Sequence, residues 1–291
     1  MPQRFPGVSM SVSLRILLRD YLNSHDLANS TERAYGTVIN VFERWHGKPA
    51  TVADLAVTAN GYLRVRLDGG TIGLDPCRGN RHTAQGHRAV IGILLRFAVQ
   101  RKWIRRFDLR PIKKRAHVPH ALLPEEISRL VAKATPMQRA AILLALDTGF
   151  RRSDLFAVTW QQAAIRDGGW VCWVVAKKTG KLEVRRLRPT TVAALESVRS
   201  ATDNRLLPRK SHNYTIWRRH WQRLGRRAGV NVDKRGLQAV RRCGASLAQA
   251  AGQDAKRYLG HSSDGVAQRY YIDPKICSDL PDLPPFPDEA A

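Results

Sequence analysis

Two short motifs near the end of the chain contain residues that can perform nucleophilic chemistry. The sequence Leu-Gly-His-Ser-Ser at residues 259–263 contains His261, and the sequence Arg-Tyr-Tyr at residues 269–271 follows it. A tyrosine phenol that loses its proton can store a bond covalently, and an imidazole can hydrogen-bond the group under attack. The two motifs therefore predict a catalytic site with Tyr270 or Tyr271 as the nucleophile.

Cationic residues upstream lie inside short motifs of their own. Arg151 follows the sequence Thr-Gly-Phe, Lys178 precedes the sequence Thr-Gly, and Arg241 lies in the sequence Val-Arg-Arg. A guanidinium offers paired donors to two phosphate oxygens and stays protonated. With His261 and a tyrosine, this ordered series resembles the catalytic series of the tyrosine recombinases, and the resemblance covers nearly the whole chain.

The resemblance implies DNA strand exchange through a 3′-phosphotyrosine intermediate, without a metal or nucleotide cofactor. It assigns the grip on the scissile phosphate to Arg151 and Arg241, and a hydrogen bond to that phosphate to His261. Lys178 matches the family's hairpin lysine, which protonates the leaving 5′-oxygen. Asp154 matches the acidic residue that orients the first arginine, because three residues along a helix return to the same face.

Two adjacent tyrosines match the nucleophile position. Tyr270 lies nine residues after His261, the commonest family spacing, whereas Tyr271 lies ten residues after it. The sequence Val-Ala-Gln-Arg-Tyr-Tyr-Ile-Asp-Pro at residues 266–274 resembles a family subset on both sides of the second tyrosine, which favours Tyr271. On a helix the two side chains are about 100° apart, so only one can reach the phosphate.

The sequence departs from the family pattern at Gln238. The family usually has a histidine three residues before the second arginine, as a base for the tyrosine proton, but glutamine cannot titrate. This departure keeps open a recombinase-derived DNA-binding protein with weak or lost cleavage. A type IB topoisomerase-like enzyme is a further alternative, because it shares this residue set.

A β-hairpin with a cationic tip is predicted at residues 170–187, where β-branched and aromatic residues surround a Thr-Gly turn. Lys177, Lys178 and Lys181 lie at the tip and are expected to contact DNA. If strand alternation continues through Lys177 and Lys178, the two point to opposite faces. The position directly before Thr179 favours Lys178 as the acid, with Lys177 as the alternative.

A basic helix is predicted before the second arginine. Tyr214, Trp217, Trp221 and Leu224 recur at helical spacing and are expected to face the core, whereas Arg219, Arg223 and Arg226 line another face. We expect this second face to contact the major groove and phosphates of DNA.

The first hundred residues show the spacing of buried helix faces. The apolar sets are Leu14, Leu17, Leu18 and Tyr21; Tyr35, Val38, Ile39, Phe42 and Trp45, with Ser30 expected as the N-cap; and Val90, Ile91, Leu94, Phe97 and Ala98. They predict a helical domain at residues 10–105. By the resemblance, this is the core-binding domain that clamps DNA.

Charge and proline mark the domain boundaries. Residues 101–115 hold eight bases and one acid, which predicts a basic linker at 106–120. Pro124 suits the first position of a helix, and this helix is expected to open a catalytic domain at 121–278. Residues 279–291, with four acids, four prolines and no base, are expected to form an irregular acidic tail. The predicted fold is mainly α with a small β-hairpin.

Composition identifies the expected partner. Lys plus Arg number 49 against 24 Asp plus Glu, a formal net charge of +25, which a polyanion such as double-stranded DNA would neutralise. A membrane-binding protein would need a cationic amphipathic helix or a lipidation signal, and we find neither. Without a signal peptide or an apolar stretch of about 18 residues, the chain is predicted to be cytoplasmic and nucleoid-associated.

Cysteine spacing and the resemblance complete the list of expected ligands and partners. The four cysteines lie far apart without a Cys-x-x-Cys motif, so neither a zinc site nor a disulfide framework is predicted. The resemblance implies a homo-oligomer, a tetramer on two paired DNA sites, with an accessory DNA-bending protein as a further candidate partner.

Overall fold

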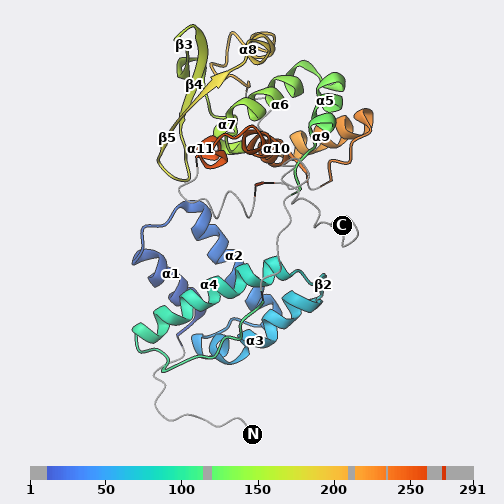
Figure 1. Ribbon diagram of the computed structural model, residues 1–291. Helices are drawn as coiled ribbons and strands as arrows, with labels where there is room; N and C mark the ends of the chain where they lie inside the picture. The colour runs from blue at the N-terminus through green and yellow to red at the C-terminus, as the bar shows by residue number, and fades with distance from the viewer. Residues whose placement is uncertain (1–11, 114–119, 209–213, 234, 261–270, 273–291) are drawn as a thin grey trace, which may run out of the picture. The chain divides into compact units, whose positions relative to one another are not determined.

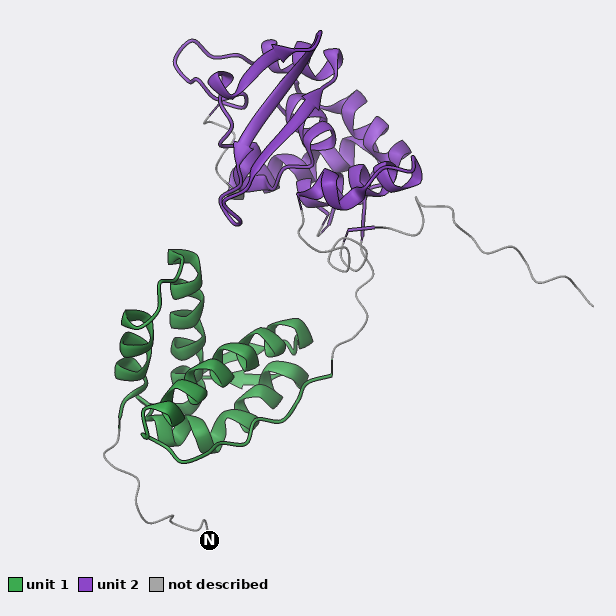
Figure 2. Cartoon of the chain, turned by 60° about the vertical axis from the view of Figure 1, so that its left-hand side comes forward, with its two compact units in different colours: residues 1–115 green, residues 116–291 purple. Residues whose placement is uncertain are grey.

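The computed structural model describes residues 12–113, 120–208, 214–233, 235–260 and 271–272. The chain divides into two compact units, residues 1–115 and 116–291, drawn in green and purple in Figure 2. Each unit has its own hydrophobic core. The fold is mainly α with small antiparallel sheets, as the sequence predicted.

The described part of unit 1 is built from four helices and one two-stranded sheet (Figure 1). The elements are α1 (Leu14–Asn23), α2 (Asn29–His46), α3 (Val52–Asp68), β1 (Gly70–Ile72), β2 (Asp75–Cys77) and α4 (Arg81–Gln100). The three predicted helices are confirmed as α1, α2 and α4, but α3 and the small sheet were not predicted. Ser30 is not the N-cap of α2, because the helix begins at Asn29 and Ala28 occupies the cap without a side-chain bond.

The first part of the predicted basic linker packs on unit 1. Leu109 and Ile112 lie against its core, and the side chain of Arg88 donates to the carbonyls of Leu109 and Arg110 at 3.0 and 2.7 Å. Asn60 Nδ2 donates to a further carbonyl of this segment at 3.1 Å. Because side chains of α3 and α4 satisfy its backbone, the segment up to residue 113 belongs to the helical unit.

Unit 2 surrounds helix α6. Its elements are α5 (Pro124–Lys133), α6 (Pro136–Thr148), α7 (Arg152–Leu155), the 3₁₀ turn η1 (Trp160–Gln162), β3 (Ala163–Arg166), β4 (Gly169–Val175), β5 (Leu182–Leu187), α8 (Pro189–Glu196), α9 (Tyr214–Ala228), α10 (Leu237–Ala250) and α11 (Ala255–Leu259). Helix α6 contacts α5, α7, α8, α10 and β5. Pro124 opens α5 as predicted, because proline at the first helical position removes a donor that would be unpaired there.

The predicted hairpin is confirmed as β4 and β5, and β3 extends it to a three-stranded antiparallel sheet. Strand β4 ends at Val175, so Lys177 and Lys178 lie in the turn rather than on a strand. The expectation that strand alternation separates these two lysines is therefore wrong.

Strand β5 has an inverted pattern of burial. Leu182 and Val184 are 64% and 44% exposed, whereas Glu183 is 4% exposed and faces inward with Leu187. Opposite them on β4, Val174 pairs with Glu183 and is buried, and Val175 pairs with Leu182 and is exposed. A charged residue therefore lies on the core side of this strand, and apolar residues lie on the solvent side.

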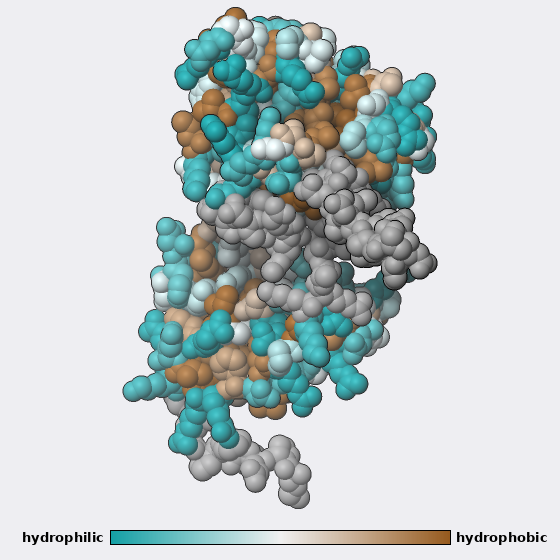
Figure 3. All heavy atoms as spheres, in the orientation of Figure 1, coloured by the Kyte–Doolittle hydropathy of each residue, from teal (hydrophilic) through white to brown (hydrophobic). Residues whose placement is uncertain are grey.

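The face of the molecule drawn in Figure 3 is mainly hydrophilic. On this face, hydrophilic side chains cover most of each unit, with smaller hydrophobic areas between them. Within the described ranges, no helix has the length and apolar character needed to cross a membrane.

Unit 1 contains a partly buried hydrogen bond that makes its stability depend on pH. Tyr62 Oη lies 2.5 Å from His87 Nδ1, and burial lowers the pKa of His87 to about 4 while raising that of Tyr62. The phenol is therefore the donor and the neutral imidazole the acceptor. Because an unfolded histidine has a pKa of about 6.5, the unfolded chain binds more protons between pH 6.5 and 4.

We expect unit 1 to lose stability as the pH falls through this window, and His87→Gln to reduce that loss. Glutamine can still accept the bond from Tyr62 but cannot titrate. Urea unfolding of the two proteins at pH 7, 6, 5 and 4 measures the difference. An equal pH dependence in both would show that another group is responsible.

Candidate active site

The first predicted arginine is placed by the end of helix α6. The helix ends at Gly149, which has a left-handed backbone (φ +58°), and Arg151 is the N-cap of α7. The turn directs Arg151 towards strand β5, where its Nη1 lies 3.4 Å from Glu183 Oε1. Its side chain is 18% exposed, so part of it remains accessible.

The second predicted arginine is almost fully buried. Arg241 lies in α10 and is 1% exposed. Its Nη2 donates to the carbonyl of Leu259 at 2.7 Å, and its Nη1 donates to the carbonyl of Gly149. Burial lowers the pKa of the Arg241 guanidinium, Tyr271 opposes this shift, and the like charge of Arg151 lowers the pKa further. The two arginines, far apart in sequence, therefore lie close enough to interact electrostatically.

Tyr271 lies beside Arg241. The Arg241 Cζ atom is 5.3 Å from the centre of the Tyr271 ring, a distance at which a cation is attracted to a ring face. The tyrosine packs on a small apolar cluster of Ala245, Ala255, Leu259 and Ile272, which joins α10 and α11. The predicted residues His261 and Tyr270 lie outside the described residues.

Asp154 does not pair with Arg151 as the sequence predicted. It is 3% exposed, and its Oδ1 accepts from Lys177 N at 3.3 Å and from Ser153 Oγ at 3.3 Å. Arg151 and Asp154 do not share a helical face, because Arg151 is the N-cap of α7 and does not have helical dihedral angles. Asp154 instead ties the start of the hairpin turn to α7, and the turn carries Lys178 as an exposed residue.

Gln238 lies on the first turn of α10, half-buried, and lines a cavity of about 370 Å³. Arg152 and Arg235 line the same cavity. Gln238 thus lies in a cavity lined by arginines and apolar side chains, one helical turn before Arg241.

Sequence reasoning missed Glu183, Arg185 and Gly260. Arg185 Nη2 lies 3.3 Å from Glu183 Oε2, and the Arg185 guanidinium also donates to the carbonyls of Thr148 and Tyr258 at 3.1 and 3.0 Å. Gly260 has φ +62°, and a Cβ there would collide with the Glu183 carboxylate. The alternation of Leu182 and Val184 in the sequence would by itself place Glu183 and Arg185 on the solvent side, so no local signal identified these two residues.

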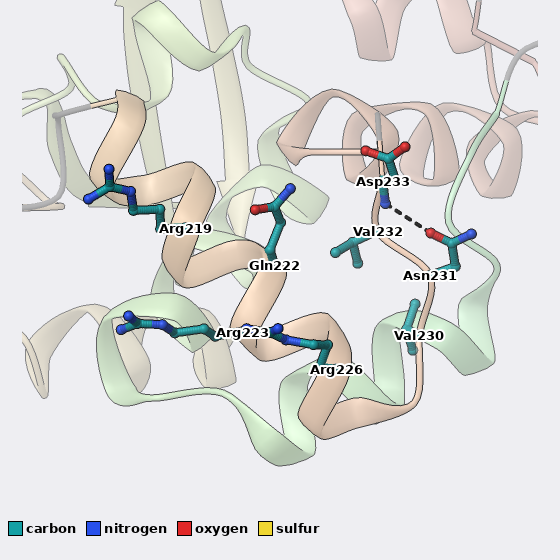
Figure 4. A pocket seen from close by; sticks show the side chains of 8 residues that line it. All are labelled: Arg219, Gln222, Arg223, Arg226, Val230, Asn231, Val232 and Asp233. Atoms are coloured by element: carbon teal, nitrogen blue, oxygen red, sulfur yellow. Dashed lines mark hydrogen bonds between the residues drawn. The ribbon is translucent and has the colours of Figure 1, made fainter.

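Helix α9 presents the predicted basic face. Trp217, Trp221 and Leu224 are buried as expected, and Arg219, Arg223 and Arg226 are exposed. These arginines line an open pocket of about 550 Å³, together with Gln222 and the segment after the helix (Figure 4). In Figure 4, Arg219 and Arg223 extend from one side of the helix, whereas Gln222 points towards Val232 and Asp233.

The described residues contain no group of three or more His, Cys, Asp or Glu side chains arranged to hold a metal ion. The three described cysteines are free, with Cys172 and Cys243 buried.

Comparisons with known proteins identify the family and the fold of the chain. The sequence model of the Phage integrase family matches residues 120–275. A comparison with curated protein sequences finds no match.

Several solved structures are similar to the chain. One is a lambda integrase (75–356) dimer bound to a COC′ core site, with 20% identity and a TM-score of 0.66, covering 94% of this chain and 99% of that chain. A lambda integrase tetramer bound to a Holliday junction has 21% identity and a TM-score of 0.69, covering 94% and 81%. The Tn1549 transposon integrase in complex with a circular intermediate DNA has 14% identity and a TM-score of 0.68, covering 96% and 98%. At these identities the likeness shows the fold.

The site depends on a glycine at the end of α6. A Cβ at Gly149 would lie 2.6 Å from Tyr258 Cε1, in addition to the strain of a positive φ. We expect Gly149→Ala to destabilise unit 2 by about 2–5 kcal/mol, the sum of the backbone and overpacking costs.

Gly168→Ala is the matched control for this prediction. Gly168 has φ +74° and no atom within 4 Å of an added Cβ, so only the backbone cost of about 1–2 kcal/mol applies. Urea unfolding measures both variants. Equal losses would mean that the contact with Tyr258 contributes nothing.

Proposed function

Because the chain belongs to the phage integrase family, whose members are tyrosine recombinases, we propose that it cuts and rejoins DNA strands through a covalent 3′-phosphotyrosine intermediate. The observation that carries the proposal is the meeting of Arg151, Arg241 and Tyr271. Arg241 lies beside the Tyr271 ring and donates to the carbonyl of Gly149, two residues before Arg151, which supports a shared site at the end of α6.

The proposed reaction assigns one role to each group. The Tyr271 phenol gives its proton to water, because Gln238 cannot accept it, and the phenol oxygen attacks the scissile phosphorus, so that a phosphotyrosine bond forms as the bond to the 5′-oxygen breaks. Lys178 gives a proton to that oxygen, and Arg151, Arg241 and His261 donate hydrogen bonds to the non-bridging oxygens as their charge shifts. Attack by a 5′-hydroxyl from another strand reverses these steps and releases the tyrosine.

These side chains supply the nucleophile, the acid and the charge stabilisation, so the proposed reaction needs no metal ion and no nucleotide. The bond energy is retained in the phosphotyrosine, which a second strand then uses. The proposed enzyme is therefore a DNA strand transferase rather than a nuclease.

The proposed DNA interface includes the exposed face of α9 and the hairpin tip. Arg219, Arg223 and Arg226 line an open basic pocket, and Lys177 and Lys181 flank the turn residue Lys178. Such cations bind phosphates and displace condensed counterions. The formal charge of +25 supports a large electrostatic contribution to DNA binding.

Further parts of the proposal concern assembly and location. Similar structures include a dimer on a core site and a tetramer on a Holliday junction, which supports a tetramer of this protein on two paired sites. We propose that the protein acts on DNA in the cytoplasm and that the helical unit 1 clamps the duplex. An accessory DNA-bending protein is a further candidate partner.

Gln238 supports a second candidate function, a DNA-binding protein with weak or lost cleavage. Its amide can hydrogen-bond but cannot accept the tyrosine proton as a base. The covalent adduct distinguishes the two functions, because a binding protein forms none.

We expect a nicked duplex that carries the true site to trap a covalent adduct in the presence of EDTA. Tyr271→Phe should abolish the adduct and Tyr270→Phe should retain it, because the first substitution removes the attacking oxygen. Denaturing gels and mass spectrometry of the adduct measure both. Adduct on Tyr270 would reverse the assignment, and dependence on a divalent metal would refute the mechanism.

We expect Gln238→His to leave DNA affinity nearly unchanged and to accelerate cleavage. The gain is bounded by that of one general base, on the order of 10² to 10⁴. Single-turnover cleavage and gel-shift titration separate the two effects. An unchanged rate would mean that another group already accepts the tyrosine proton.

A further inference from the structure

We propose that Glu183 is a positioning residue that holds Arg151 in place for the scissile phosphate and links it to the turn before His261. This inference rests on the proposed function. It concerns a buried carboxylate to which the reaction itself assigns no role.

The burial of Glu183 runs against the ordinary pattern of a half-exposed strand. On β5 the apolar Leu182 and Val184 face solvent, while Glu183 faces the core at 4% exposure. If strand β5 presented its other face to the core, Leu182 and Val184 would be buried and Glu183 would be exposed to water. A local rule that is broken in this way is typical of a functional position.

The Glu183 carboxylate bridges two arginines through different oxygens. Oε1 lies 3.4 Å from Arg151 Nη1, and Oε2 lies 3.3 Å from Arg185 Nη2. Arg185 is fixed in turn by the carbonyls of Thr148, Arg257 and Tyr258, at 3.0–3.1 Å. Arg151 is thus linked through Glu183 to an arginine that three backbone carbonyls hold in place.

Like charges make such a link necessary before DNA binds. The charge of Arg151 lowers the pKa of the buried Arg241. Arg185 and Arg151 both form ion pairs with the Glu183 carboxylate. Three guanidiniums gathered around the end of α6 repel one another until a phosphate arrives. Glu183 offsets this repulsion, so the site can be preorganised rather than assembled at the moment of reaction.

The same carboxylate supports the turn that leads to His261. Gly260 is the C-cap of α11, and its Cα lies so close to Glu183 that a side chain at this position would strike the carboxylate. Arg185 also holds the carbonyls of Arg257 and Tyr258 just before this turn. One carboxylate therefore contacts both the first arginine and the segment that precedes the histidine.

The first experiment measures single-turnover cleavage of the nicked duplex by Glu183→Gln, Glu183→Asp and wild type. Removing a transition-state donor costs roughly 10²- to 10³-fold, and we expect Glu183→Gln to slow cleavage by less, on the order of 10- to 100-fold, with DNA affinity unchanged. Glu183→Asp keeps the charge and should recover part of the rate.

A double-mutant cycle tests whether Glu183 acts through Arg151. In an Arg151→Ala background, Glu183→Gln should have little further effect, because the group that it positions is gone. An undiminished effect in that background would overturn the proposal. So would wild-type cleavage by Glu183→Gln.

Glu126→Gln is the matched control for a loss of stability. Glu126 pairs with Arg235 in the same unit, with a side chain 14% exposed, and it contacts neither Arg151 nor Arg185 in the described structure. We expect this variant to lower the melting temperature without slowing cleavage. Equal slowing by both variants would indicate a merely structural role for Glu183.

A second measurement does not depend on cleavage. Phenylglyoxal modifies accessible arginines, and mass spectrometry of the free protein reports the labelling rate of Arg151. We expect Glu183→Gln to increase this rate several-fold and Glu126→Gln to leave it unchanged. Unchanged labelling in Glu183→Gln would refute the pairing, whereas a wild-type protein that forms no adduct would refute the proposed function alone.

Discussion

The burial of the Arg241 guanidinium is the constraint on which the rest of unit 2 depends. Moving an arginine charge from water to an interior is costly unless its donors find acceptors. Here the acceptors are the carbonyls of Gly149 and Leu259, which lie at the C-terminal ends of α6 and α11. Carbonyls in the last turn of a helix have no partner within the helix, and the helix dipole favours a cation there. A single side chain of α10 therefore joins three helices.

The packing around this arginine explains why glycines border it. Tyr258 Oη donates to the carbonyl of Leu146 at 2.7 Å, and burial raises the pKa of the phenol, which keeps it a donor. Its ring fills the space beside Gly149 and Gly244, where any Cβ would collide with it. The close approach of α6, α10 and α11 thus requires two residues without side chains and one large aromatic ring between them. This packing sets the position from which Arg241 can act.

The site also shows how a strongly basic protein can keep its cations organised. Arg185 and Arg151 share the Glu183 carboxylate, while Asp154 is engaged by the hairpin backbone. The exposed arginines of α9 have no such requirement, because water and salt screen them until DNA replaces the counterions. Buried cations need fixed acidic or carbonyl partners, and surface cations need only a phosphate backbone to bind.

Local patterns in the sequence were sufficient to predict several helices and strands of this protein. Apolar spacing predicted α1, α2 and α4, and the β-branched run with its Thr-Gly turn predicted β4 and β5, because both depend on periods of a few residues. The motifs around Arg151 and Arg241 marked the residues that the fold brings together. Helix α3 was missed because its apolar residues do not keep to one narrow face.

The tertiary structure decided which partner each charged group has. Glu183 and Arg151 are 32 residues apart, and nothing local distinguishes the inward face of β5 from the outward one. The alternation of Leu182 and Val184 would by itself place the apolar face inside. Instead, Glu183 faces inward, against the ends of α6 and α11. There its carboxylate neutralises the charges of Arg151 and Arg185, and this stabilisation exceeds what burial of Leu182 and Val184 would contribute.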